Sequence, residues 1–117
     1  MDQVSIGEFA RKARLSVSAL RLYDERGPLV PARVDDDSGY RYYDLVQVKD
    51  ARLVAMLRQI DMPLAAIKEL LGCDPAEAVR RVAEHWRQAE ASHAARRALA
   101  GYLVARLTGR NPIPCMR

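Results

Sequence analysis

The sequence predicts a mostly α-helical protein with one small β-hairpin near residue 35 and one long helix in its last third. Three observations support this fold class. Three capping boxes, "SIGE", "DLVQ" and "DPAE", mark helix starts. Pro and Gly cluster between residues 27 and 39, where a helix cannot continue. An apolar heptad pattern runs without proline from residue 76 to residue 107.

The composition describes an ordinary globular chain. Of its 117 residues, 50% are hydrophobic and 29% are charged, which argues against disorder. No apolar run approaches the ~18 residues that span a membrane, and the start "MDQVSIGEF" lacks the apolar core of a signal peptide. Two distant cysteines, Cys73 and Cys115, fit reduced thiols in a cytoplasmic protein.

The net charge of +4 is unevenly distributed. Residues 1–72 hold 11 basic and 11 acidic side chains, and residues 73–117 hold 8 and 4. Total charge is therefore weak evidence for a nucleic-acid partner, and that case depends on where individual arginines lie.

Two short helices open the chain. Ser5 and Glu8 form a capping box for a helix over 6–13, and Ser16 caps a second helix over 17–26 that Gly27 ends. Only "RLS" separates them, which predicts a helix-turn-helix.

The segment after Gly27 predicts a two-stranded wing followed by a second helix pair. "LVPARV" and "YRYY" have strand propensity, and "DDDSG" between them is typical of a turn. Asp44 starts a helix that runs to about Ile60, and Pro63 occupies the first position of another helix that ends at Gly72. The apolar positions of the first of these helices predict its core face: Leu45, Val48, Leu53, Met56, Leu57 and Ile60.

The strongest helix start is "DPAE", with Asp74 as cap and Pro75 in the first turn. A helix from Pro75 to Leu107 would be roughly 50 Å long, too long to bury its apolar stripe against so small a domain. We therefore expect a coiled coil with a second chain, parallel or antiparallel; the alternative is a helix that folds back on its own domain. The expected seam comprises Val79, Val82, Trp86, Ala89, Ala100, Leu103 and Leu107, interrupted by His93 and Arg96.

Taken in order, "VSIGEFA", "LRLYDERG", "SGYRYYD", "LRQIDMPLAAIKELL" and the long helix resemble the MerR family of bacterial transcription regulators over residues 4–110. The resemblance implies a winged helix-turn-helix, a second helix pair and an antiparallel coiled-coil homodimer. It also implies binding to double-stranded DNA at a near-palindromic operator in an over-long promoter spacer. There the protein distorts the DNA so that RNA polymerase engages the promoter. The sequence shows no Ser/His/Asp set, no catalytic carboxylate pair and no phosphate loop, so we expect no enzyme activity and no cofactor.

That resemblance divides the chain into a DNA-binding domain (1–72), a dimerisation helix (73–110) and a tail or linker to an effector domain (111–117). It also implies the DNA-contacting side chains. An arginine fork can clamp a phosphate or read guanine, and a tyrosine hydroxyl can donate to phosphate. The implied contacts are Arg11, Lys12, Ser18, Arg21, Tyr23, Arg33, Tyr40, Arg41 and Arg58.

Some of these residues could have a structural role instead of a contact with DNA. Arg21 can pair with Glu25 one turn later. Arg41 can pair with Asp44, and Tyr40, Tyr42 and Tyr43 can form a hairpin core.

The chain departs from the family pattern at Arg14, Leu22, Pro28 and Asp61. Arg14 and Asp61 stand where the family usually has glycine. These changes predict a reshaped turn, or an added backbone contact, at Arg14, and repulsion of phosphate at Asp61.

Two other functions stay open. One is a dimeric protein adaptor that never binds DNA, which the charge balance of residues 1–72 supports. The other is a regulator that senses a soft metal through Cys73 and Cys115 across the dimer. The effector and the operator sequence do not follow from these residues.

Overall fold

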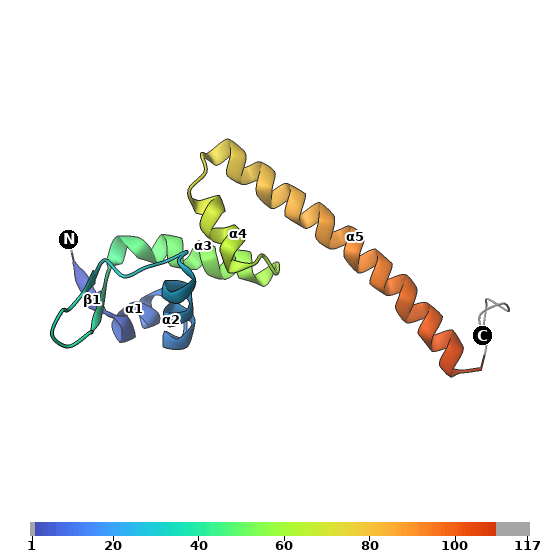
Figure 1. Ribbon diagram of the computed structural model, residues 1–117, viewed down its shortest axis with the longest axis horizontal. Coiled ribbons are helices and arrows are strands. Elements are labelled where there is room, and N and C mark those ends of the chain that lie inside the picture. The colour runs from blue at the N-terminus through green and yellow to red at the C-terminus, as the bar shows by residue number, and fades with distance from the viewer. Residues whose placement is uncertain (1, 110–117) are drawn as a thin grey trace. The chain divides into compact units, whose positions relative to one another are not determined.

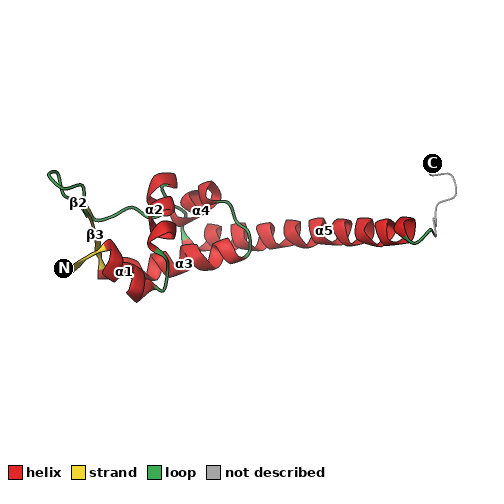
Figure 2. Ribbon diagram, turned by 90° about the horizontal axis from the view of Figure 1, so that it is seen from below, coloured by secondary structure: helices red, strands yellow, loops and turns green. Residues whose placement is uncertain are grey.

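The computed structural model describes residues 2–109 and is mostly helical (Figures 1 and 2). Two compact units divide the chain, residues 1–78 and 79–117. In chain order the elements are β1 (Gln3–Ser5), α1 (Ile6–Ala13), α2 (Val17–Arg26), β2 (Arg33–Val34), β3 (Arg41–Asp44), the 3-10 helix η1 (Leu45–Gln47), α3 (Val48–Gln59), α4 (Leu64–Leu71) and α5 (Pro75–Leu107). The predicted mostly α fold, with its helix-turn-helix and long last helix, is confirmed.

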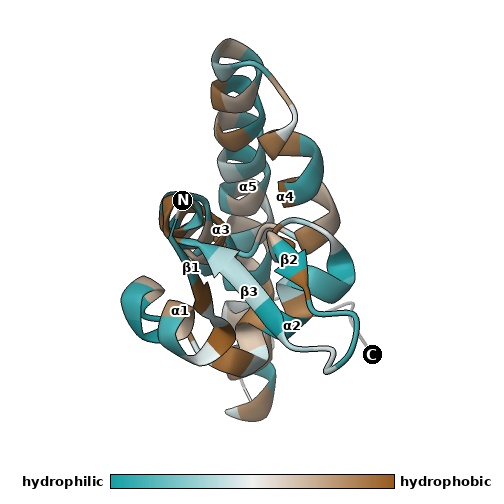
Figure 3. Ribbon diagram, turned by 90° about the vertical axis from the view of Figure 1, so that its left-hand side faces the viewer, coloured by the Kyte–Doolittle hydropathy of each residue, from teal (hydrophilic) through white to brown (hydrophobic). Residues whose placement is uncertain are grey.

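The predicted two-stranded wing is present as β2 paired with β3, and β1 adds a third strand that was not predicted. The strand order is β1-β3-β2 (Figure 3), with Val4 opposite Tyr43 and Arg33 opposite Tyr42. Strand β1 was hard to predict because it is three residues long and its last residue, Ser5, is also the cap of α1. It forms because β3 offers a second edge for hydrogen bonding.

The helix-turn-helix starts at the predicted caps. Ser5 Oγ accepts the Glu8 amide at 3.3 Å, and Ser16 Oγ accepts the Ala19 amide at 3.0 Å. Between the helices Arg14 adopts a left-handed backbone, with φ 60° and ψ 45°. Arg52 of α3 donates from Nη1 to the carbonyl oxygen of Ala13 at 3.1 Å, which holds the end of α1.

The core of this unit is centred on the stack of Phe9 and Tyr43. Their ring centroids lie 4.6 Å apart at 16°, and both side chains are fully buried. Around them pack the buried side chains of Ala10, Ala13, Leu20, Tyr23, Leu29, Ala51, Val54, Leu57, Met62, Ile67 and Leu70. The stack therefore joins α1 to the wing.

The predicted core face of α3 was partly wrong. Leu57 is buried, but the other buried positions are Ala51 and Val54, and Met56 is 50% exposed. The capping box of Asp44 and Gln47 opens a 3-10 turn, and α3 begins only at Val48. The predicted face thus included Leu45, which belongs to the 3-10 turn, and only residues from Val48 on follow the period of the α-helix.

The α3–α4 connection differs by one residue from the prediction. Pro63 is the cap of α4, with an extended backbone at ψ 148°, not its first helical residue. Asp61 before it has φ 64°. Among residues 2–109, Arg14 and Asp61 are the non-glycine residues with positive φ, and both stand where the family pattern has glycine.

Helix α5 has the predicted bounds and 33 residues. Asp74 Oδ1 accepts the Glu77 amide at 2.8 Å, as the capping box requires. Within α5 no residue is buried. In the described part of the chain, no helix combines the length and the apolar character needed to cross a membrane.

The left-handed turn gives a first prediction. An arginine in this conformation destabilises the folded state by about 1–2 kcal/mol. Glycine removes this strain, but it also makes the unfolded chain more flexible, which offsets part of the gain. We expect Arg14→Gly to raise the free energy of unfolding by about 0.5–1 kcal/mol in urea titrations at fixed protein concentration.

The matched control is Arg14→Ala, which removes the side chain and keeps the backbone strain. If Arg14→Gly is no more stable than Arg14→Ala, the strain does not exist.

Candidate nucleic-acid interface

Residues 33–44 form the wing. A surface hollow of about 290 Å³, the wing cleft, lies between the wing and α2. The wing cleft brings together the start of α1, the outer face of α2 and strand β3. Its lining comprises Ser5, Ile6, Arg21, Gly39, Tyr40, Arg41 and Tyr42. Three of the predicted DNA contacts, Arg21, Tyr40 and Arg41, thus share one site.

Most of the other predicted contacts are open to solvent. Ser18 lies exposed on α2, Arg11 and Lys12 are exposed in the last turn of α1, and Arg33 is exposed on β2. Exposure leaves these side chains able to meet a duplex, and their contacts with DNA remain predictions.

Tyr23 differs from this group. It is only 6% exposed, and burial raises the pKa of its hydroxyl above the usual value, an effect that the charge of Arg58 opposes. The ring is part of the core beneath α2. We therefore assign Tyr23 to packing, in contrast with the expectation that its side chain faces DNA.

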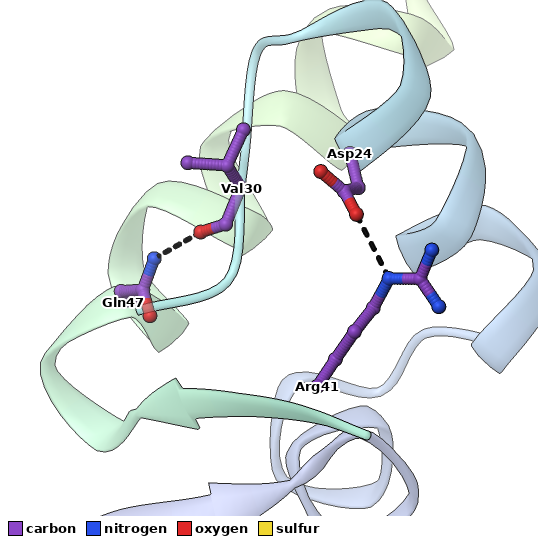
Figure 4. A network of polar contacts seen from close by, with 4 residues as sticks. All are labelled: Asp24, Val30, Arg41 and Gln47. Carbon is purple, nitrogen blue, oxygen red and sulfur yellow. Dashed lines mark hydrogen bonds and ion pairs between the residues drawn. The ribbon is translucent and has the colours of Figure 1, made fainter. Parts of the chain in front are cut away.

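Arg41 forms an ion pair, but not with the residue considered from the sequence. Its Nε donates to Asp24 Oδ2 on α2 at 2.8 Å (Figure 4). The alternative pairing with Asp44 was wrong, since Asp44 takes part in the capping box and donates its amide to Gln47 Oε1 at 2.9 Å. In the same view the Gln47 amide donates to the Val30 carbonyl at 2.8 Å, which fixes the chain that leads into the wing.

Asp24 is the partner of Arg41 that sequence reasoning missed. It stands in "LYDERG", 17 residues before Arg41. An acid near the C-terminal end of a helix is unfavourable there, and this was the available signal that it has a partner elsewhere.

The three wing tyrosines have three different surroundings. Tyr43 is buried against Phe9, and Tyr40 is exposed at the cleft. The ring of Tyr42 lies under the guanidinium of Arg33, 4.3 Å from its centroid. The hairpin-core alternative therefore holds for Tyr43 alone, and the Tyr42 ring helps to position an arginine.

The wing turn is held by its own polar groups. Gly39 takes φ 76° and donates its amide to the Asp35 carbonyl at 2.8 Å. The Ser38 hydroxyl, followed by the Asp37 amide, lowers the pKa of the Asp35 carboxyl. Because this acidic tip would repel phosphate, we expect it to lie beside a bound duplex, with the basic cleft as the contact.

Two of the predicted phosphate contacts have structural partners as well. Arg58 donates from Nη1 to the Met62 carbonyl at 2.8 Å and so closes the α3–α4 turn. Arg33 donates from Nε to Gln3 Oε1 at 3.2 Å, across the sheet. Both bonds hold the arginine stems in place.

The metal-sensing alternative gains no support from the described residues. Cys73 donates from Sγ to the Glu69 carbonyl at 3.3 Å, and Cys115 lies outside residues 2–109. Within that range no group of three or more His, Cys, Asp or Glu side chains could hold a metal ion.

The predicted dimer seam on α5 is largely open. Val79, Trp86, Leu103 and Leu107 are exposed, with Leu107 at 87%, while Val82 and Ala89 are half-buried. Leu99 and Val104, which the predicted seam omits, are exposed as well.

Comparison with known proteins adds the family. The model of the MerR HTH family regulatory proteins matches residues 4–72, more than half of the chain. Transcriptional regulator BrlR of Pseudomonas aeruginosa is 43% identical over 67 residues, which are 57% of this chain and 25% of BrlR. The chain spans about a quarter of the length of such curated relatives.

Two solved structures share the fold. PbrR691 from Ralstonia metallidurans CH34, in complex with lead(II), has a TM-score of 0.70 at 30% identity, covering 86% of this chain and 83% of that one. EcmrR, from the EcmrR–DNA complex in EcmrR-RPo, has a TM-score of 0.64 at 28% identity, covering 92% of this chain and 41% of EcmrR.

The buried hydroxyl of Tyr43 gives a second prediction. It has no hydrogen-bond partner among the described residues, and burial followed by the nearby Asp24 charge raises its pKa, which Arg41 partly offsets. The folded state therefore holds this proton more tightly than the unfolded state. The contribution of this proton to the free energy of unfolding is fully present below about pH 10, the pKa of tyrosine in the unfolded chain. It is lost as the pH rises through the higher pKa of the folded state.

We expect Tyr43→Phe to remove this alkaline loss and to raise the free energy of unfolding by about 1 kcal/mol at pH 7, since an unpaired buried hydroxyl disappears. Tyr40→Phe, at an exposed position in the same wing, should keep the wild-type alkaline profile. Urea titrations from pH 7 to 11 test both. Identical profiles for wild type and Tyr43→Phe would contradict the assignment.

Proposed function

This chain belongs to the MerR family of helix-turn-helix regulatory proteins, and from that premise we propose that it regulates transcription by binding a near-palindromic promoter operator as a homodimer. The family is one of regulators and not of enzymes. The observation that carries the proposal is the wing cleft, where Arg21 of α2 and Arg41 of the wing line one hollow. Two arginines on one exposed hollow suit a DNA phosphate.

Helix α2 is the proposed reading element. It has ten residues, and its exposed face carries Ser18 and Arg21. A helix of this kind fits the major groove, where an arginine can bind guanine through two hydrogen bonds. The wing beside it supplies Tyr40 and Arg41 for the phosphate backbone. EcmrR, which has the same fold, forms a complex with DNA, and this supports DNA binding by the present chain.

Helix α5 is the proposed dimerisation element. Its exposed Val79, Trp86, Leu103 and Leu107 follow the a and d positions of one heptad frame. A second copy covers this stripe, and an antiparallel pairing, as in the family, relates the two copies by a two-fold axis. Two reading helices related by that axis require an operator with inverted symmetry.

The proposed mechanism extends to the promoter. A dimer fixed at both ends of an operator can bend or untwist the DNA between its half-sites, and the bound state then favours the distorted duplex. RNA polymerase is the proposed partner on that duplex, in the cytoplasm. The adaptor alternative retains the charge balance of residues 1–72 in its favour, but it gives the exposed Arg21 of the cleft no role.

Selection of duplexes from a random pool tests the proposal. We expect the wild-type chain to enrich an inverted repeat. Arg21→Ala should weaken binding to the enriched duplex by about 1–3 kcal/mol, because a bidentate base contact or a phosphate clamp is lost.

Arg97→Ala is the matched control, since it removes the same charge from an exposed position on α5. It should change binding by less than about 0.5 kcal/mol. Enrichment of no repeat, or equal losses in the two variants, would argue against α2 as the reading helix.

A further inference from the structure

We propose that Asp24 is a positioning residue for DNA binding: by holding Nε of Arg41, it aims the two terminal nitrogens of that arginine at a DNA phosphate in the wing cleft. The inference rests on the proposed function, and it assigns a role to an acidic residue that has no charge attraction to DNA. The Asp24–Arg41 ion pair is called the clasp below.

The geometry of the clasp leaves the useful edge of the guanidinium open. The carboxylate engages Nε at 2.8 Å, and Figure 4 shows both terminal nitrogens on the side turned away from Asp24. Those two nitrogens carry four of the five N–H donors of an arginine. Their planar pair matches two oxygens of one phosphate.

The open edge belongs to a residue that lines the wing cleft. Arg21 lines the same hollow from α2, and Tyr40 lines it from the wing. With about 290 Å³, the hollow has room for a phosphate group, since a water molecule occupies about 30 Å³ in the liquid. A phosphate there would meet two cationic side chains at once.

Fold stability alone does not account for Asp24. The side chains of Arg41 and Asp24 are 36% and 23% exposed, and an ion pair this open to water stabilises a fold only weakly. Asp24 also lies in the last turn of α2, where the helix dipole disfavours a negative charge. We therefore assign to Asp24 a role in orienting the guanidinium of Arg41.

The opposite effect is physically possible and gives the test its sign. A carboxylate near DNA repels phosphate and partly neutralises Arg41. If neutralisation dominates, removing Asp24 strengthens binding. If orientation dominates, as we propose, removing Asp24 weakens binding, because the guanidinium loses its fixed direction and must be ordered when DNA binds.

The experiment measures the affinity of the 117-residue chain for two duplexes of equal length. One duplex is the repeat enriched by the wild type, and the other is a mixed-sequence duplex at low salt, where phosphate contacts dominate. The variants are Asp24→Ala, Asp24→Asn, Arg41→Ala and the double variant Asp24→Ala with Arg41→Ala. Thermal unfolding of each variant verifies that it is folded.

We expect Asp24→Ala to weaken binding to both duplexes about five- to tenfold and to leave the salt slope unchanged, because Arg41 still reaches the phosphate once it is ordered. Arg41→Ala should lower the salt slope by about one. Asp24→Asn keeps an oxygen acceptor for Nε and should stay within about twofold of the wild type. In the Arg41→Ala background, Asp24→Ala should have no further effect, since the two residues act as one unit.

Tighter binding by both Asp24 variants would overturn the inference in favour of neutralisation. An equal loss with and without Arg41 would overturn it in favour of a general structural role. If the wild type binds the mixed duplex but enriches no repeat, the operator proposal fails while the clasp is still tested. If the wild type binds neither duplex, both proposals fail.

Discussion

The stack of Phe9 on Tyr43 is the contact on which the arrangement of the site depends. It fixes strand β3 against α1, with both rings fully buried. Because strand side chains alternate between two faces, fixing Tyr43 inward also turns Arg41, two residues earlier, toward the helices. There it meets Asp24 of α2. The opposite face receives Tyr42, directly across from Arg33 on β2, and the two side chains meet in a cation–π contact. One aromatic contact in the core thus sets the direction of two surface arginines.

The starts of α1, α2 and α5 could be predicted from the sequence because local chemistry determines them. Ser5, Ser16 and Asp74 each accept a backbone amide three residues later, and such a pattern is visible in four residues of sequence. The features that could not be predicted depend on distant partners. Strand β1 forms on the free edge of β3. The buried face of α3 depends on α1 and α4, which pack against this helix. The partner of Arg41 lies 17 residues away on another element, whereas local reasoning considered only Asp44.

In the candidate site, too, some features could be predicted from the sequence and others depend on packing between distant residues. The exposed basic residues of α1, α2 and the wing were identified from the family pattern, and the structure leaves them open to solvent. The family pattern implied that Tyr23 faces DNA, while the packing of α2 buries its ring. Arg14 and Asp61 show how this chain tolerates departures from the pattern. At both positions the backbone keeps the left-handed conformation that suits glycine, although a residue with a side chain is strained in this conformation.

The central claim is that two copies of one cleft, related by a two-fold axis, bind one duplex. Hydroxyl-radical footprinting of the wild-type chain on its enriched duplex tests this claim most directly. Our account predicts two protected backbone regions of equal strength, placed symmetrically about the centre of the repeat and separated by about one helical turn or a multiple of it. A single protected region, or protection that ignores the symmetry of the repeat, would contradict it.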